Sequence, residues 1–94
     1  MEVRIDLPGL LAGVLGRDHL VVEAETLAGA LAAAYAATPA LRPLLEDEAG
    51  VLREHVLVLL RTAGGTVDSR WLEDLERPLE PGDAIVVMQA VSGG

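Results

Sequence analysis

A single long helical stretch, residues 26–38, constrains the fold of this chain most, because strand-like segments lie on both sides of it. Apolar side chains recur there at helical spacing, and they are Leu27, Ala30, Leu31, Ala34 and Tyr35. Alanine favours helix strongly, and its small side chain lets a helix lie close to a sheet. Thr26 is suited to be the N-cap, and Thr38 followed by Pro39 ends the pattern. The stretch predicts one main helix packed on a sheet.

The residues before this helix predict two strands. Residues 1–7 alternate, with Val3, Ile5 and Leu7 on one side, which is the pattern of a half-buried strand. Residues 19–24 predict a second strand. Residues 10–16, between them, are expected to form a short apolar connection. We therefore expect an N-terminal hairpin with a rather long loop.

The residues after the helix predict a short helical turn and two more strands. Residues 40–45 are expected to add a turn or two of helix. Residues 55–60 contain the most continuous apolar run and predict a central strand that is buried on both faces. A Pro-Gly-Asp turn at residues 81–83 leads into the last strand, residues 84–91. This order of elements predicts one domain of the α+β class.

Charge and composition narrow the classes of function. The net charge of −8 argues against direct binding of nucleic acid, because contacts to phosphate need clustered basic side chains. No run approaches the ~20 apolar residues of a membrane span, and the N-terminus lacks the pattern of a signal peptide. Without cysteine, the chain has no disulfide framework. We expect a cytoplasmic protein with neither a nucleic acid nor a membrane as its partner.

No group of polar side chains in the sequence predicts a catalytic or metal site. His19 and His55 lie far apart, and neither cysteine nor the spacing of a zinc motif accompanies them. The acidic run at residues 46–48 lacks the spacing of a calcium-binding loop. We therefore expect no metal, no bound cofactor and no catalytic residue, and we do not expect an enzyme.

The sequence ends on Gly93 and Gly94, directly after the last predicted strand. Glycine usually serves inside a chain, where a turn needs a positive φ or the backbone needs a close approach. A terminal pair instead supplies a thin tail with an unhindered carboxylate, which can enter a narrow channel of another protein. A frayed, glycine-rich chain end is the alternative. The sequence favours a functional tail.

The last predicted strand carries a second candidate feature. If Ile85 and Val87 point into the core, alternation along the strand places Val86 and Met88 on the opposite face. Apolar side chains there, leading to the tail, would form a docking patch for a partner. The alternative is that another part of the fold covers them. The sequence favours the docking patch.

Several segments match one known family over nearly the whole chain. They are residues 3–8, 21–27, 41–47, 50–53 and 78–87, followed by the final Ala90-Val91-Ser92-Gly93-Gly94. The most specific motif is P-L-x-x-G-D, followed by a strand that leads to V-x-G-G at the end. On these residues the chain resembles the MoaD/ThiS family of ubiquitin-like sulfur carriers.

This resemblance implies a ubiquitin-like β-grasp fold, in which a mixed sheet packs on one main helix. It implies a domain at residues 1–91 and a flexible Gly-Gly tail at residues 92–94. In the family, an adenylylating enzyme of the ubiquitin-activating type uses ATP to adenylate the terminal glycine, here Gly94. Sulfur then replaces AMP and leaves a thiocarboxylate, which donates the sulfur to a synthase. Gly93 would supply clearance beside the reacting group.

The resemblance leaves the receiving pathway open. The length and the opening strand look closer to carriers for cysteine synthesis, and the small subunit of molybdopterin synthase is the other leading branch. The chain lacks the Phe residues that are common in the molybdopterin type, and its loop at residues 60–65 is longer than the family usually shows. The alternatives are a carrier for thiolation of tRNA or another metabolite, and a ubiquitin-like interaction module that is never activated.

Overall fold

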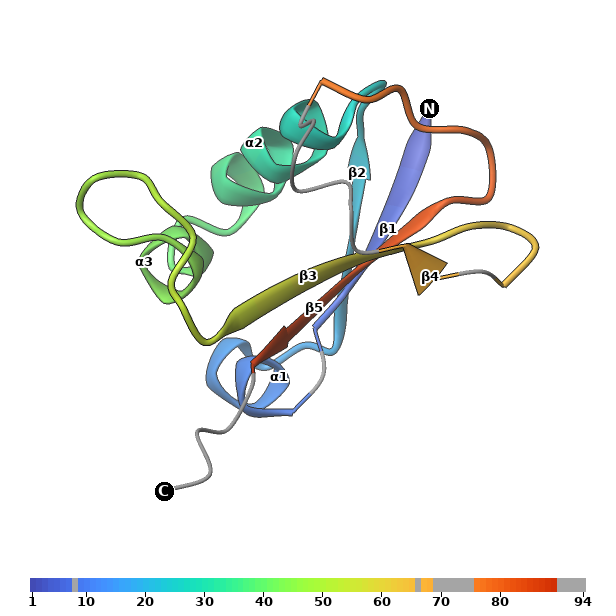
Figure 1. Cartoon of the computed structure of the whole chain (residues 1–94). Coiled ribbons are helices and arrows are strands. Elements are labelled where there is room, and N and C mark those ends of the chain that lie inside the picture. The colour runs from blue at the N-terminus through green and yellow to red at the C-terminus, as the bar shows by residue number, and fades with distance from the viewer. Residues whose placement is uncertain (8, 66, 69–75, 90–94) are drawn as a thin grey trace.

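The computed structural model describes residues 1–7, 9–65, 67–68 and 76–89 of the chain (Figure 1). The bounds of the strands and helices are β1 Glu2–Asp6, α1 Leu10–Leu15, β2 His19–Glu23, α2 Leu27–Ala37, α3 Leu41–Leu45, β3 Val56–Arg61, β4 Val67–Asp68 and β5 Ala84–Gln89. Strands and helices alternate up to α2, after which α3 and the three strands β3, β4 and β5 follow.

The strands form one mixed sheet in the order β2-β1-β5-β3-β4. β1 pairs with β2 antiparallel and with β5 parallel. β3 pairs antiparallel with both β5 and β4. The strand that comes last in the sequence therefore lies in the middle of the sheet, between the β1–β2 hairpin and the β3–β4 pair. This arrangement is the β-grasp, so the predicted α+β fold is confirmed.

α2 packs on one face of the sheet and encloses the core. The Thr26 hydroxyl accepts a hydrogen bond from the backbone N–H of Gly29 at 3.1 Å, and it caps the helix as predicted. Leu27, Ala30 and Ala34 are buried against the strands. The strands contribute every second residue to this core, namely Val3, Ile5, Leu20, Val22, Val56, Val58, Leu60, Ile85 and Val87. The opposite face of the sheet, which we call the open face, has no such buried cluster among the described residues.

Residues 10–15 form the helix α1, where the sequence predicts an apolar connection. Two glycines with positive φ flank the helix, Gly9 at 66° and Gly16 at 73°. The N–H of Gly16 donates to the carbonyl of Ala12 at 2.9 Å and closes the last turn, while Leu11 is buried in the core. The expectation of a loop is wrong because 6 residues make less than two helical turns, and so short a stretch shows no helical period.

β3 alternates between buried and accessible side chains, where the sequence predicts a strand buried on both faces. Val58 and Leu60 are buried, whereas Leu57 is 45% exposed. The prediction is wrong because the helices cover one face of the sheet and leave apolar side chains of the open face accessible. The short strand β4 is a further element that the sequence pattern does not predict.

β5 follows the predicted turn, in which Gly82 has a φ of 90° that suits glycine. The described strand ends at Gln89. Residues 90 and 91 of the predicted strand lie outside the described residues. The same holds for the predicted tail, residues 92–94, so the boundary between domain and tail stays a prediction.

Candidate functional site

The last described strand, β5, is the central strand of the sheet. β5 pairs with β1 on one side and with β3 on the other, so both of its edges are occupied. Gly93 and Gly94, the predicted reactive end, lie outside the described residues. What the structure shows is the place where the described chain ends, at Gln89 (Figure 1).

β5 presents two different faces along its length. Ile85 and Val87 are each 0% exposed, and Val87 pairs in register with the buried Val58 of β3. Val86 is half-buried, and Met88 is 41% exposed. The two predicted docking residues therefore lie on the open face, as the alternation requires. Docking itself stays a prediction.

Val86 and Met88 belong to a larger apolar surface on the open face. In the register of β3 and β5, Leu57 lies beside Met88 and Leu59 lies beside Val86. Opposed side chains of antiparallel strands are about 5 Å apart at Cβ, so these four residues are neighbours. We call them the open-face patch. The sequence pattern assigns Leu57 and Leu59 to the core, and only the pairing of β3 with β5 reveals their place.

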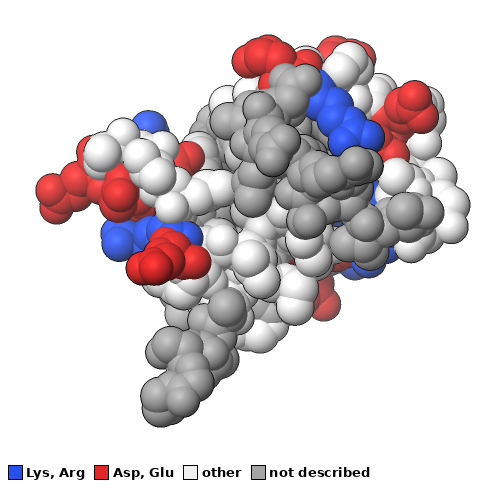
Figure 2. All heavy atoms as spheres, in the orientation of Figure 1, with Lys and Arg blue, Asp and Glu red and all other residues white. Residues whose placement is uncertain are grey.

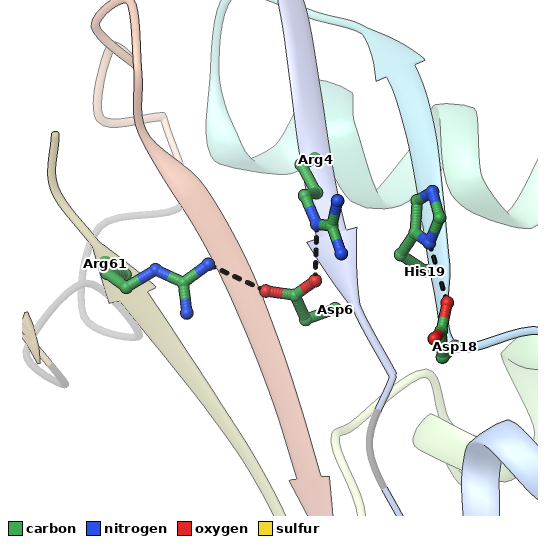
Figure 3. A network of polar contacts seen from close by, with 5 residues as sticks. All are labelled: Arg4, Asp6, Asp18, His19 and Arg61. Atoms are coloured by element: carbon green, nitrogen blue, oxygen red, sulfur yellow. Dashed lines mark hydrogen bonds and ion pairs between the residues drawn. The ribbon is translucent and has the colours of Figure 1, made fainter.

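A network of charged side chains borders the open-face patch (Figure 3). Asp6 of β1 accepts a hydrogen bond from Arg4 Nε at 2.7 Å and another from Arg61 Nη2 at 2.8 Å. Burial disfavours the charged carboxylate, but the two guanidinium groups outweigh it and lower the pKa of Asp6. Arg61 reaches Asp6 across β5, where the register places the small Ala84 between Arg61 and Arg4. The network joins β1 to β3 over the central strand.

A groove of about 610 Å³ lies between α2 and α3, and its lining consists mainly of alanine and other small or apolar side chains. Its polar members are Tyr35, Arg42 and Glu46. The Arg42 guanidinium lies 5.8 Å from the centroid of the Tyr35 ring, and its Nε lies 3.5 Å from a carboxylate oxygen of Glu46. Burial and the neighbouring Glu46 carboxylate raise the pKa of Tyr35. The raised pKa keeps the Tyr35 hydroxyl protonated near neutral pH, so it does not act as a nucleophile there.

The two histidines lie at separate exposed places. His19 begins β2 and its Nδ1 lies 2.7 Å from Oδ1 of the neighbouring Asp18, while His55 lies in the turn before β3. In the part of the chain that the structure describes, no three His, Cys, Asp or Glu side chains could together hold a metal ion. Figure 2 shows acidic side chains gathered around the loop that follows α3, next to a few basic ones. No helix within the described ranges is long and apolar enough to cross a membrane.

Solved structures of small proteins match this chain over its whole length. Small archaeal modifier protein 1 of Haloferax volcanii is 28% identical, with 100% of both chains covered and a TM-score of 0.79. The protein of the same name from Methanosarcina acetivorans is 26% identical, covers 99% of this chain and 96% of its own, and has a TM-score of 0.78. The fold is shared with a chain of the Amycolatopsis orientalis BexX/CysO complex, which is 18% identical and has a TM-score of 0.74. The match covers 98% of this chain and 99% of the other.

No protein-family model and no curated protein matches the sequence. The structural neighbours are ubiquitin-like proteins of the MoaD/ThiS type. The resemblance that the sequence predicts is therefore confirmed, together with the β-grasp fold.

Proposed function

We propose that this chain is a sulfur carrier whose Gly94 is adenylated by a partner enzyme and converted to a thiocarboxylate. One observation carries the proposal. The chain matches small archaeal modifier protein 1 from end to end at 28% identity, and its central strand leads toward Gly93 and Gly94. A carrier needs no catalytic group of its own, because the partner supplies the active site and binds ATP.

The chemistry takes place at the carboxylate of Gly94. A carboxylate is a poor electrophile, so the partner first joins it to AMP from ATP, with release of pyrophosphate. Hydrosulfide then attacks the carbonyl carbon, a C–S bond forms, and the bond to AMP breaks. The resulting thiocarboxylate is a nucleophile, and it delivers its sulfur to the acceptor enzyme.

Two other features of the chain serve this reaction. Gly93 keeps the segment narrow next to the reacting group, since any Cβ would widen it. The open-face patch, with Val86 and Met88, offers a partner an apolar surface on the same strand that leads to Gly94. CysO of Amycolatopsis orientalis forms a complex with BexX, which supports docking of a partner protein on this fold.

We propose synthesis of cysteine or of molybdopterin as the receiving pathway. The chain length and the opening strand favour the cysteine branch, and the lack of Phe counts against the molybdopterin branch. Thiolation of tRNA or of another metabolite uses the same thiocarboxylate and is the alternative. Incubation of the thiocarboxylated protein with candidate acceptor enzymes, followed by loss of the sulfur from the carrier, identifies the pathway.

The proposal is tested by the intact mass of the full-length protein. The protein is incubated with ATP, sulfide and a complete extract of its source cells. Conversion of the carboxylate to a thiocarboxylate replaces one oxygen by sulfur, and the mass should rise by about 16 Da. Deletion of Gly94 should abolish this shift while the fold remains intact. An unchanged mass of the wild-type protein would contradict the proposal.

Two substitutions test the supporting features. Gly93→Val should fold normally and be converted slowly, because a β-branched side chain widens the segment and restricts its backbone. Met88→Asp should also slow conversion, because it places an unpaired charge in an apolar contact. If Gly93→Val were converted at the wild-type rate, no narrow channel of the partner would require glycine at this position.

The match to small archaeal modifier protein 1 favours a second candidate function, the attachment of Gly94 to another protein. An amine of the target would attack the same adenylate, an amide bond would form and AMP would leave. The intact mass separates the two functions, since attachment adds the mass of a whole second protein. The interaction module that is never activated predicts neither product.

A further inference from the structure

Two large apolar side chains on α1 face solvent. Leu10 is 69% exposed and Val14 is 68% exposed, more than any other large apolar side chain among the described residues. They are four residues apart in a helix and therefore lie on the same side of it. Leu11, one position further round, is buried and holds α1 against the core. We call Leu10 and Val14 the α1 ridge.

The topology places the α1 ridge at the edge of the sheet where the described chain ends, at Gln89. β1 and β5 are parallel neighbours, so both strands end at the same edge. α1 follows β1 and therefore lies at this edge, where it contacts β5 (Figure 1). In register, Asp6 at the end of β1 lies beside Val86, so β5 continues past β1 for three more residues, to Gln89.

The reach of the chain limits where a partner can stand. Five peptide units connect Gln89 to Gly94, and a fully extended chain spans at most ~3.6 Å per residue, or about 18 Å in all. Whatever the conformation of these residues, a protein that acts on Gly94 must come within this distance of the end of β5. α1 contacts β5 and lies at the same edge of the sheet, so a partner that approaches Gly94 from this side can also cover α1.

The chemistry of α1 defines the partner surface. Residues 9–16 carry no charge, although the chain as a whole has a net charge of −8. A basic partner surface would pair with acidic side chains in other parts of the chain. The uncharged α1 ridge instead suits an apolar partner surface. Val51 provides a comparison, because it is also largely exposed, at 60%, but lies in the loop between α3 and β3.

We propose that the α1 ridge is a docking contact for the enzyme that activates Gly94, and that an apolar surface of that enzyme covers Leu10 and Val14. This inference rests on the proposed function. It adds a second contact to the open-face patch, and it lies on the helix that follows β1, the other strand of the parallel pair. An enzyme that acts on Gly94 would then contact both apolar surfaces.

The test compares the same chemical change at two exposed positions. Val14→Ser and Val51→Ser both replace a largely exposed valine, so neither should alter the melting temperature by more than about 2–4 °C. The conversion assay described above is repeated over a range of carrier concentrations. Val14→Ser should raise the carrier concentration that gives half-maximal conversion. The double variant Leu10→Ser, Val14→Ser should raise it further, by about tenfold. The conservative pair Leu10→Met with Val14→Ile should behave as the wild type.

The outcomes separate the two proposals. If the Leu10→Ser, Val14→Ser variant reaches half-maximal conversion at the same concentration as the wild type, the docking role of α1 is overturned and the proposed function stands. An equal rise of this concentration in Val51→Ser overturns the docking role as well, because the effect would then not be specific to α1. Failure of the wild-type protein to be converted overturns the proposed function, and the inference about its partner falls with it. Self-association that is lost in the double variant would identify a second copy as the occupant and contradict the proposal.

Discussion

Aspartate at Val87 and at Met88 should have opposite effects, because the two side chains lie on different faces of β5. Val87 is 0% exposed beside Val58, and burial of such a side chain contributes about 1.5–3 kcal/mol. An unpaired polar group in a core costs a further 1–3 kcal/mol, roughly, and a charged one costs more. Val87→Asp should therefore lower the free energy of unfolding by at least about 3–6 kcal/mol. A domain of 94 residues has about 5–14 kcal/mol in total, so this variant should lose a large part of its stability and unfold at a much lower urea concentration.

Met88→Asp should lower the free energy of unfolding by about 1 kcal/mol or less, because Met88 is half-exposed and aspartate only disfavours the strand weakly. Urea unfolding at pH 7, followed by far-ultraviolet circular dichroism, compares the variants. Val87→Thr keeps the side-chain shape and adds one buried hydroxyl, so it should lose about 1–3 kcal/mol and remain measurable. A larger loss for Met88→Asp than for the Val87 variants would show that the faces of β5 are reversed and that the open-face patch is wrong.

Two further substitutions test the charged network and the turn before β5. Asp6→Asn should lower the free energy of unfolding by about 1 kcal/mol at pH 7, since it removes the negative charge with which Arg4 and Arg61 pair. The pKa of Asp6 is lowered in the folded protein, so this stabilisation is present above about pH 4 and is lost as the pH falls through the folded pKa. A difference between variant and wild type that stays constant in urea unfolding at neutral and strongly acidic pH would refute this. Gly82→Ala should cost about 2 kcal/mol or more, because φ is 90° and the new Cβ would lie 2.6 Å from that of Ala63. Gly13→Ala meets no atom within 4 Å and should be neutral or stabilising, so equal melting temperatures for the two alanine variants would contradict the strain at Gly82.

Patterns that repeat within one element predict most of this fold. The alternation over residues 1–7 and the helical spacing over residues 27–35 each continue long enough to separate the two periods. Thr26 marks the start of α2 through a cap that acts within one turn. α1 is too short to show a helical period, and the glycines on either side of it are equally typical of a loop.

The candidate site follows from the sequence only where local information is sufficient. Gly93 and Gly94 stand out by position, and the face of Met88 follows from alternation once the core side is assumed. Leu57 becomes a surface residue only through the pairing of β3 with β5. The contact between Asp6 and Arg61 joins residues that are 55 positions apart, and no local pattern encodes it.

The position of β5 between two neighbours also determines how the molecule bears a mechanical load. An enzyme that took hold of the chain beyond Gln89, as the proposed function requires, would pull on β5 along its length. The hydrogen bonds to β1 and β3 run across the strand, so such a force shears them together instead of opening them one after another. A pull on the end of β5 would therefore load both neighbouring strands at once, and the sheet would resist it as a unit.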